Sequence, residues 1–233
     1  MKLLNYLQKK YAISRRWFTQ LVDEGNVFVE NKKVDSYKQE VTEGQKIKVN
    51  MPRKIIEDTI HIQNEESYLV LFNKPKWYVA SKADENNQTI YEILPKEFAN
   101  LYYIWRLDKD SHGLLLLTND TNLVNEYTHP SHEVTKEYIV HLNSPITDFV
   151  IKWSKQWVED EWEILKVKTI NLVDWKDKTR VKIQLNEWKK RHIRRMFRAL
   201  WLRVEDLQRV SEWERKLDNI ALWKRRKVTL QKK

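Results

Sequence analysis

Cysteine is absent from this chain of 233 residues, and glycine is nearly absent. Without cysteine the protein can form no disulfide, no thiolate nucleophile and no cysteine-ligated zinc site, which fits a reducing compartment. The sequence also contains no apolar run long enough to cross a membrane and no secretory leader. At this length, and with 41% hydrophobic residues, the chain can bury a core. We therefore expect a globular cytoplasmic protein.

The shortage of glycine coincides with an excess of tryptophan. Only 3 glycines occur, although average usage of about 7% predicts roughly 16 in a chain of this length, whereas tryptophan occurs 11 times. Several tryptophans stand in polar, turn-like segments, where positive φ or a close backbone approach favours glycine. These segments are "NKPKW" (73–77), "LVDWKDK" (172–178), "NEWKK" (186–190) and "SEWERK" (211–216).

We interpret the tryptophans as glycines encoded by UGA, in a genetic code that reads this codon as glycine. The glycines and tryptophans together come close to the glycine number expected from average usage. The alternative is a tryptophan-rich protein that stacks nucleic-acid bases. That alternative leaves the shortage of glycine unexplained.

The charge balance indicates a polyanionic partner. The formal net charge is +10 at pH 7, which is typical of proteins that bind nucleic acid or acidic surfaces. We expect nucleic acid rather than a membrane, because the sequence contains no amphipathic membrane anchor. We also expect a monomer.

The first fifty residues predict two helices, a hairpin and a strand. Leu3, Leu4 and Leu7 fall on one helical face, and Ser14 is the expected N-cap of a second helix that ends at Gly25. The segments that follow predict a hairpin and then an alternating strand, in "NVFVENKKV" (26–34) and "EGQKIKV" (43–49).

This order of elements resembles the S4 RNA-binding domain of ribosomal proteins and RNA-modifying enzymes. In that domain the second helix rests on folded RNA. The resemblance therefore implies that Arg15 and Arg16, which open the second helix, bind RNA. The alternative is a helix start that only faces solvent.

The rest of the chain predicts a second domain of α+β class. Residues 51–67 read as a linker, so that we expect an S4-like domain with its linker over 1–62 and a catalytic domain over 63–233. Strands outnumber helices there, without the βαβ alternation of a doubly wound fold, which favours a mixed, mainly antiparallel sheet. The expected strands are "YLVLFNKP", "GLLLLT", "KEYIVHL", "KVKTINLV" and "RVKIQL", and the expected helices are "QTIYEILP", "TNLVNEY" and a longer one from about Lys189 to Leu200.

The segment "IWRLDKDSHGLLLLTND" (104–120) contains the first candidate for chemistry. Asp108 lies between Arg106 and Lys109, just before an apolar strand, so that neighbouring cations favour its ionised form. An ionised carboxylate at the start of a strand can act as a nucleophile or a general base. The alternative is a turn aspartate paired with an arginine.

With glycine read at Trp105, "GRLDKDSHGLLLLTND" is similar to the catalytic motif of ribosomal RNA pseudouridine synthases that carry an N-terminal S4 domain. The segments "NKPKWYVAS" (73–81), "THPSHEVTKEYIV" (128–140) and "NEWKKRHIRRMFRALWLRVEDLQRV" (186–210) resemble the other motifs of this family, in the same order. The enzymes that modify small-subunit RNA and those that modify large-subunit RNA share these features, so that the sequence does not decide which RNA is the substrate. This sequence departs from the family motifs at four tryptophans, and the family has glycine at each of these positions: Trp77, Trp105, Trp188 and Trp201. Trp213 and Trp223 fall near further glycines of the family.

The resemblance implies an enzyme that isomerises a uridine of ribosomal RNA to pseudouridine. Asp108 matches the essential aspartate that attacks the target uridine, and attack at the ribose or at the ring both stay open. Tyr138 matches the tyrosine that stacks beneath the flipped base, although a strand tyrosine can also simply pack in a core. Arg194 matches the arginine that pairs with the aspartate and keeps it ionised. The reaction requires no cofactor and no metal.

Basic residues in and near these motifs are the candidate RNA-binding residues of the second domain. In the helix from Lys189, the apolar residues recur at core spacing and leave the arginines on another face, where they can contact phosphates. Lys136 precedes the "EY" of the second motif and can alternatively face water. The candidates are Arg106, Lys136, Lys190, Arg191, Arg195 and Arg198.

Two rival interpretations remain. His129, His132 and His141 suggest a metal site, but no carboxylate spacing supports one. A non-catalytic S4-type RNA-binding or ribosome-assembly protein would keep the basic surfaces. In that protein Trp105 and Trp188 would be genuine and would block the pocket.

Overall fold

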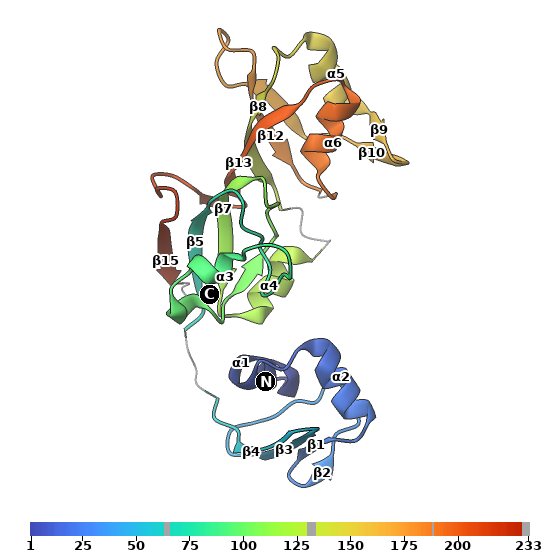
Figure 1. Ribbon diagram of the computed structural model, residues 1–233, viewed down its shortest axis with the longest axis vertical. Coiled ribbons are helices and arrows are strands. Elements are labelled where there is room, and N and C mark those ends of the chain that lie inside the picture. The colour runs from blue at the N-terminus through green and yellow to red at the C-terminus, as the bar shows by residue number, and fades with distance from the viewer. Residues whose placement is uncertain (63–65, 130–133, 188, 230–233) are drawn as a thin grey trace. The chain divides into compact units, whose positions relative to one another are not determined.

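The computed structural model describes residues 1–62, 66–129, 134–187 and 189–229 (Figure 1). The chain forms two compact units, Met1–Glu66 and Ser67–Lys233.

The first unit packs two helices against a four-stranded sheet with the strand order β2-β1-β3-β4. The Ser14 side chain accepts a hydrogen bond from the Trp17 backbone nitrogen at 3.2 Å, which confirms the predicted N-cap. The predicted apolar faces are buried, as Leu3, Leu7 and Phe18 show. The elements are α1 (Leu3–Tyr11), α2 (Arg15–Asp23), β1 (Val27–Val29), β2 (Lys32–Lys33), β3 (Lys46–Met51) and β4 (Lys54–Thr59).

Strand β4 lies in a segment that the sequence predicted as a linker. It pairs antiparallel with β3, and the Asp58 carboxylate accepts hydrogen bonds from Tyr6 Oη at 2.6 Å and Tyr11 Oη at 2.8 Å, which join the strand to α1. The alternation is hard to read because Ile55 and Ile56 are adjacent, and only Ile56 is buried while Ile55 is 59% exposed.

The second unit is built on a nine-stranded sheet with the main order β11-β12-β8-β13-β7-β5-β15. β13 pairs parallel with β7, and the other described strand pairs are antiparallel, so that the predicted mixed, mainly antiparallel sheet is confirmed. The sheet strands are β5 (Tyr68–Lys74), β6 (Tyr102–Ile104), β7 (His112–Thr118), β8 (Lys136–Leu142), β11 (Thr169–Leu172), β12 (Arg180–Leu185), β13 (Val204–Glu212), β14 (Arg215–Lys216) and β15 (Arg225–Thr229).

The remaining elements of this unit are a hairpin and short helices. Figure 1 shows α5 and α6 beside the half of the sheet formed by β8, β12 and β13. The elements are β9 (Val158–Asp160), β10 (Glu163–Leu165), α3 (Ile90–Ile93), a 3₁₀ helix (Lys96–Phe98), α4 (Thr121–Thr128), α5 (Asp148–Gln156) and α6 (His192–Ala199).

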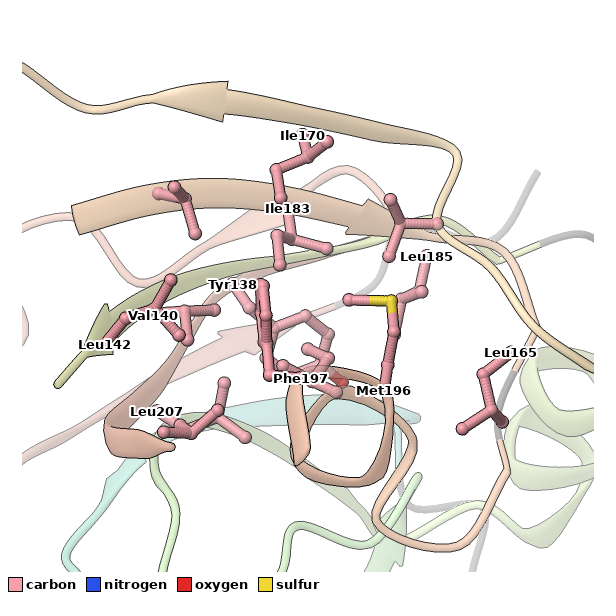
Figure 2. Packing of buried hydrophobic residues seen from close by; sticks show 14 of the residues in the cluster. Tyr138, Val140, Leu142, Leu165, Ile170, Ile183, Leu185, Met196, Phe197 and Leu207 are labelled. Atoms are coloured by element: carbon pink, nitrogen blue, oxygen red, sulfur yellow. The ribbon is translucent and has the colours of Figure 1, made fainter. Parts of the chain in front are cut away.

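Two buried features explain the apolar sequence patterns. The leucines of β7 alternate between two core clusters, so that the strand is covered on both faces. On α6, Ile193, Met196 and Phe197 are buried, and Figure 2 shows Met196 and Phe197 in the cluster that contains Tyr138 and Ile183. The helix begins at His192, later than predicted.

Six of the tryptophans that the structure describes have a left-handed backbone. Side chains at such φ values are strained, by roughly 1–2 kcal/mol for an ordinary residue. Burial does not compensate for the strain at Trp162 and Trp201, which are 97% and 94% exposed. The interpretation of the tryptophans as glycines is therefore supported by the backbone as well as by composition, while Trp188 lies outside the described residues. The six φ values are 75° at Trp77, 52° at Trp105, 65° at Trp162, 63° at Trp201, 53° at Trp213 and 67° at Trp223.

We predict that glycine at all six left-handed positions raises the free energy of unfolding. The summed strain, about 1–2 kcal/mol per site, is comparable with the roughly 5–15 kcal/mol that keeps a domain folded. Urea denaturation of the chain with and without the six substitutions measures the difference. As a matched control, glycine at Trp17 and Trp153, inside α2 and α5, should lower stability by about 1 kcal/mol per site.

The coding hypothesis has its own test in the native protein. Mass spectrometry of peptides from the source organism should find glycine at Trp105 and Trp188. Peptides that carry tryptophan at these two positions would overturn the hypothesis.

Candidate active site

The centre of the site is a row of four residues across the middle of the sheet. Tyr138 on β8 neighbours Arg209 on β13, which neighbours Gly113 on β7, which neighbours Lys74 on β5. At Gly113 the backbone has φ 105°, and a Cβ would lie 2.3 Å from the Arg209 carbonyl oxygen. Only glycine allows the two strands to approach this closely.

Asp108 lies on the loop between β6 and β7, directly before this row. Lys74 is fully buried, and its Nζ donates hydrogen bonds to the backbone oxygens of Pro75 at 2.9 Å, Asp108 at 3.1 Å and Ser111 at 2.8 Å. Burial lowers the pKa of Lys74 to about 7, assisted by the charge of Arg209. The Lys74 side chain therefore holds the backbone of the loop between β6 and β7 at Asp108 and Ser111.

The Asp108 carboxyl group is half-buried, and its environment differs from the sequence-based expectation. Burial raises its pKa above the ordinary aspartate value, and the charges of Arg191, Arg194 and Lys74 only partly oppose this effect. The cations predicted to act here lie elsewhere: Arg106 is exposed, and Lys109 donates to the Asn87 side chain at 2.5 Å. The sequence predicted that neighbouring cations favour the ionised form of Asp108. Cations do lower its pKa, but they are Arg191, Arg194 and Lys74, and desolvation outweighs them.

Arg194 pairs with Asp110 and not with Asp108 as expected. Its Nε lies 3.2 Å from Asp110 Oδ2, and its guanidinium also donates to the backbone oxygens of Asp110 and Val204, both at 3.0 Å. Arg191 Nη2 lies 2.8 Å from the same Asp110 oxygen. Asp110 thus joins the Asp108 loop to the start of α6.

Tyr138 is fully buried in the core cluster shown in Figure 2. Burial raises the pKa of Tyr138 to about 12, the charge of Arg209 opposes the rise, and the charge of Asp108 adds to it. The tyrosine therefore stays neutral and lies within electrostatic reach of Asp108. Its stacking beneath a flipped base remains a prediction.

A buried ion pair supports the other side of the loop. Arg209 and Glu212 are both fully buried, with Nη2 of the arginine 3.1 Å from the carboxylate. Arg209 donates to the backbone oxygens of Leu114 at 2.7 Å and Trp105 at 2.9 Å, which flank the loop. Burial raises the pKa of Glu212 to about 7. Sequence reasoning missed this pair and Lys74, although charges inside a strand of alternating burial are a usable signal.

Lys136 does not face solvent or RNA. Its side chain is fully buried, its Nζ lies 3.7 Å from the centre of the Trp105 ring, and burial lowers the pKa of Lys136 to about 8. The Trp105 ring donates through Nε1 to the Tyr127 backbone oxygen at 2.9 Å. The prediction that Lys136 binds RNA directly is wrong for this structure, because the strand places its side chain on the inner face.

Beside Asp110, α6 and the segment after it line a basic hollow of about 560 Å³. Arg195 lines this hollow but is mostly buried, because its guanidinium pairs with Asp160 at 2.7 Å and Glu163 at 2.5 Å. Arg198 pairs with Asp160 at 3.0 Å but stays 63% exposed. The exposed candidates for RNA contact are Arg15, Arg16, Arg106, Lys190, Arg191 and Arg198.

The described residues contain neither a cluster of metal-ligating side chains nor a membrane-spanning helix. Within the described ranges, no group of three or more histidine, aspartate and glutamate side chains is placed to hold a metal ion. His132, one of the histidines considered, lies outside these ranges. None of the described helices has the length and apolar character needed to span a membrane.

Comparison with known proteins identifies the family and the fold. Residues 68–199 match the family described as RNA pseudouridylate synthase, and residues 1–47 match the S4 domain. A structure described as a pseudouridylate synthase shares the fold, with a TM-score of 0.66 at 23% identity, covering 98% of this chain and 96% of that chain.

Curated relatives cover most of the sequence. An uncharacterized RNA pseudouridine synthase of Aquifex aeolicus is 32% identical over 94% of this chain and 88% of its own. The ribosomal large subunit pseudouridine synthase B of Bacillus subtilis is 30% identical over 84% of this chain and 79% of its own. The dual-specificity RNA pseudouridine synthase RluF of Escherichia coli K12 is 30% identical over 98% of this chain and 76% of its own. The chain therefore belongs to the RNA pseudouridylate synthase family, in the branch that carries an N-terminal S4 domain.

Proposed function

We propose that this enzyme converts a specific uridine of ribosomal RNA to pseudouridine and that Asp108 is the nucleophile. The observation that carries the proposal is the Asp108 carboxyl group, which accepts no hydrogen bond from the described part of the chain, while its backbone is fixed by Lys74. The Bacillus subtilis relative is named for the ribosomal large subunit, and the S4 domain supports binding to structured RNA. Family membership disfavours a non-catalytic RNA-binding role.

The proposed reaction moves one glycosidic bond. Attack by Asp108 allows the bond between N1 of uracil and C1′ of the ribose to break, and the uracil turns so that C5 faces C1′. The C5–C1′ bond then forms, C5 loses its proton and N1 gains one, so that the product is an isomer of the substrate. Asp108 leaves as a free carboxylate, which fits a group whose ionised form is needed at both ends of the reaction.

The surroundings of Asp108 suit a base that has left its stack. Enzymes that act on a base in structured nucleic acid first extrude the nucleotide. Tyr138 is neutral and lies within electrostatic reach of Asp108, but it is fully buried, so that stacking on the base requires its ring to become accessible when RNA binds. The exposed Arg191 and Arg198 at α6 lie at the basic hollow, where they can contact the phosphates.

Replacement of Asp108 by asparagine tests the nucleophile. Asp108→Asn keeps the shape but removes the attacking charge, and we expect it to abolish pseudouridine formation and leave RNA affinity nearly unchanged. Release of tritium from C5 of labelled uridine in ribosomal RNA measures turnover. The control is Asp218→Asn, which removes an exposed partner of Arg226 and should keep turnover. Wild-type turnover in the Asp108→Asn variant would show that the nucleophile is misassigned.

The role of the first unit is tested by salt dependence. Arg15→Ala with Arg16→Ala should reduce the slope of log affinity against log salt concentration by about 1.5, because each lost phosphate contact removes about 0.7–0.9. The control pair is Lys32→Ala with Lys33→Ala, which removes the same charge from β2 of the same unit. Equal slopes in the two double variants would contradict a specific RNA-binding role for the start of α2, and so would unchanged affinity on deletion of residues 1–60.

A further inference from the structure

We propose that Glu161 limits how tightly the basic hollow beside α6 binds the RNA backbone, because it places a carboxylate next to Arg198 where a phosphate of the RNA would bind. The proposal rests on the proposed function, since it takes RNA as the ligand of the hollow. It concerns affinity for the RNA backbone and not the chemical step at Asp108.

The charged lining of the hollow is almost entirely basic. Among the described residues that line it, Glu161 is the one carboxylate. A surface of this kind attracts the phosphates of RNA whatever the base sequence. A carboxylate in the lining works against this attraction and needs a separate explanation. The basic residues are Lys190, Arg191, Arg194, Arg195, Arg198 and Arg203.

The turn that carries Glu161 does not explain the choice of glutamate. Strands β9 and β10 form a hairpin beside α6 (Figure 1), and Asp160 pairs with Glu163 across it. The loop between them is therefore Glu161 and Trp162, with φ 49° and 65°. Two-residue loops with positive φ at both positions favour asparagine, aspartate or glycine at the first position. Glutamate is uncommon in this backbone conformation.

The packing of α6 does not require Glu161 either. Arg195 is mostly buried and pairs with Asp160 at 2.7 Å and with Glu163 at 2.5 Å. Its distance to the Glu161 carboxylate is 3.9 Å, and Glu161 is 69% exposed. An exposed pair at such a distance adds little to stability. Arg195 is therefore neutralised without Glu161.

Glu161 does reach Arg198. Its Oε1 lies 3.4 Å from Arg198 Nη2, which also donates to the two Asp160 carboxylate oxygens at 3.0 and 3.1 Å. In the part of the chain that the structure describes, these contacts all use Nη2, and the Arg198 side chain stays 63% exposed. The other edge of the guanidinium is therefore open to a phosphate in the hollow. A phosphate that binds there lies close to the Glu161 carboxylate.

Repulsion between the phosphate and Glu161 lowers the affinity of the hollow. Like charges that are brought together at an interface oppose binding. Phosphate contacts supply essentially all of the binding to non-specific RNA but only a share of the binding to a specific site. Glu161 therefore removes a larger share of the affinity for RNA that is held through phosphates alone, which favours release from RNA that is not the substrate.

The test measures binding of the full-length chain to poly(A) over a range of salt concentrations, in whichever of the tryptophan and glycine forms is more stable. Poly(A) contains no uridine, so that binding is measured without turnover. We expect Glu161→Gln to raise the affinity about two- to fivefold at low salt. We also expect a slope of log affinity against log salt concentration that is steeper by about 0.7, the value for one phosphate of a single strand. Loss of a merely structural residue would not tighten binding.

Matched variants separate the local charge from the net charge and from side-chain shape. Glu159→Gln removes the same charge from an exposed residue of the same hairpin, which is not among the described residues that line the hollow, and it should change the affinity far less. Glu161→Asn suits the turn and should bind poly(A) as tightly as Glu161→Gln. In a chain that carries Arg198→Gln, the Glu161→Gln substitution should raise the affinity no more than Glu159→Gln does, because Glu161 acts through Arg198.

Two results would overturn the role of Glu161. Equal affinity and slope in Glu161→Gln and Glu159→Gln would show that net charge alone matters. A gain that persists undiminished with Arg198→Gln would show that the carboxylate acts elsewhere. Failure of the proposed nucleophile or of turnover on ribosomal RNA is seen separately, by tritium release. A wild-type chain whose affinity for RNA does not depend on salt would contradict RNA as the ligand of the hollow, and this proposal with it.

Discussion

The active-site loop depends on a buried ammonium group. Lys74 ends β5, a strand covered on both faces, and its Nζ is bonded to three backbone oxygens. A charge in such a place is costly unless it is well bonded. The reduced basicity of Lys74 follows from that cost. Lys74 holds the backbone oxygens of Asp108 and Ser111. The side chains of Asp108 and Asp110 are therefore not needed to hold the loop and can make other contacts.

A second buried cation, Arg209, also holds the backbone near this loop. Arg209 bonds the carbonyl groups at both ends of the loop and is itself neutralised by Glu212. The close approach of β7 and β13 at Gly113 brings this guanidinium within reach. The pair is not fully hydrogen-bonded, since Arg209 Nη1 and both Glu212 carboxylate oxygens have no hydrogen-bond partner among the described residues. A buried ion pair of this kind can specify one arrangement at some expense of stability. A loop that carries the half-buried Asp108, the proposed nucleophile, needs that specificity more than it needs stability.

Patterns of local origin could be predicted from the sequence. The Ser14 cap and the apolar faces of α1 and α2 depend on residues a few positions apart, and the strand with four leucines needs only a continuous apolar run. Strand β13 could not be read in this way. It carries Arg209 and Glu212 at inward positions, and a strand with buried charges has no simple apolar alternation.

Partners of charged side chains were the least predictable part of the site. Asp108, Tyr138 and Arg194 were predicted from the resemblance, and Arg194 and Tyr138 each interact electrostatically with Asp108. Sequence spacing does not state that Arg194 meets Asp110, or that Lys136 points inward, because both depend on pairings between distant strands and helices. The direction of the Asp108 pKa shift was missed for the same reason, since burial is a property of the fold.

The left-handed tryptophans have a consequence for the gene rather than for the enzyme. If these codons are UGA, only a translation system that inserts glycine at UGA makes the full-length chain with glycine at these positions. A ribosome that stops at UGA would end the chain before Trp17, within the first turn of α2. A system that inserts tryptophan would complete a chain with large rings at turns such as those of Trp77 and Trp201. Under this hypothesis, the glycine form of the full-length chain is made only in hosts that share the code, and the left-handed φ values of the six tryptophans are what such a code predicts.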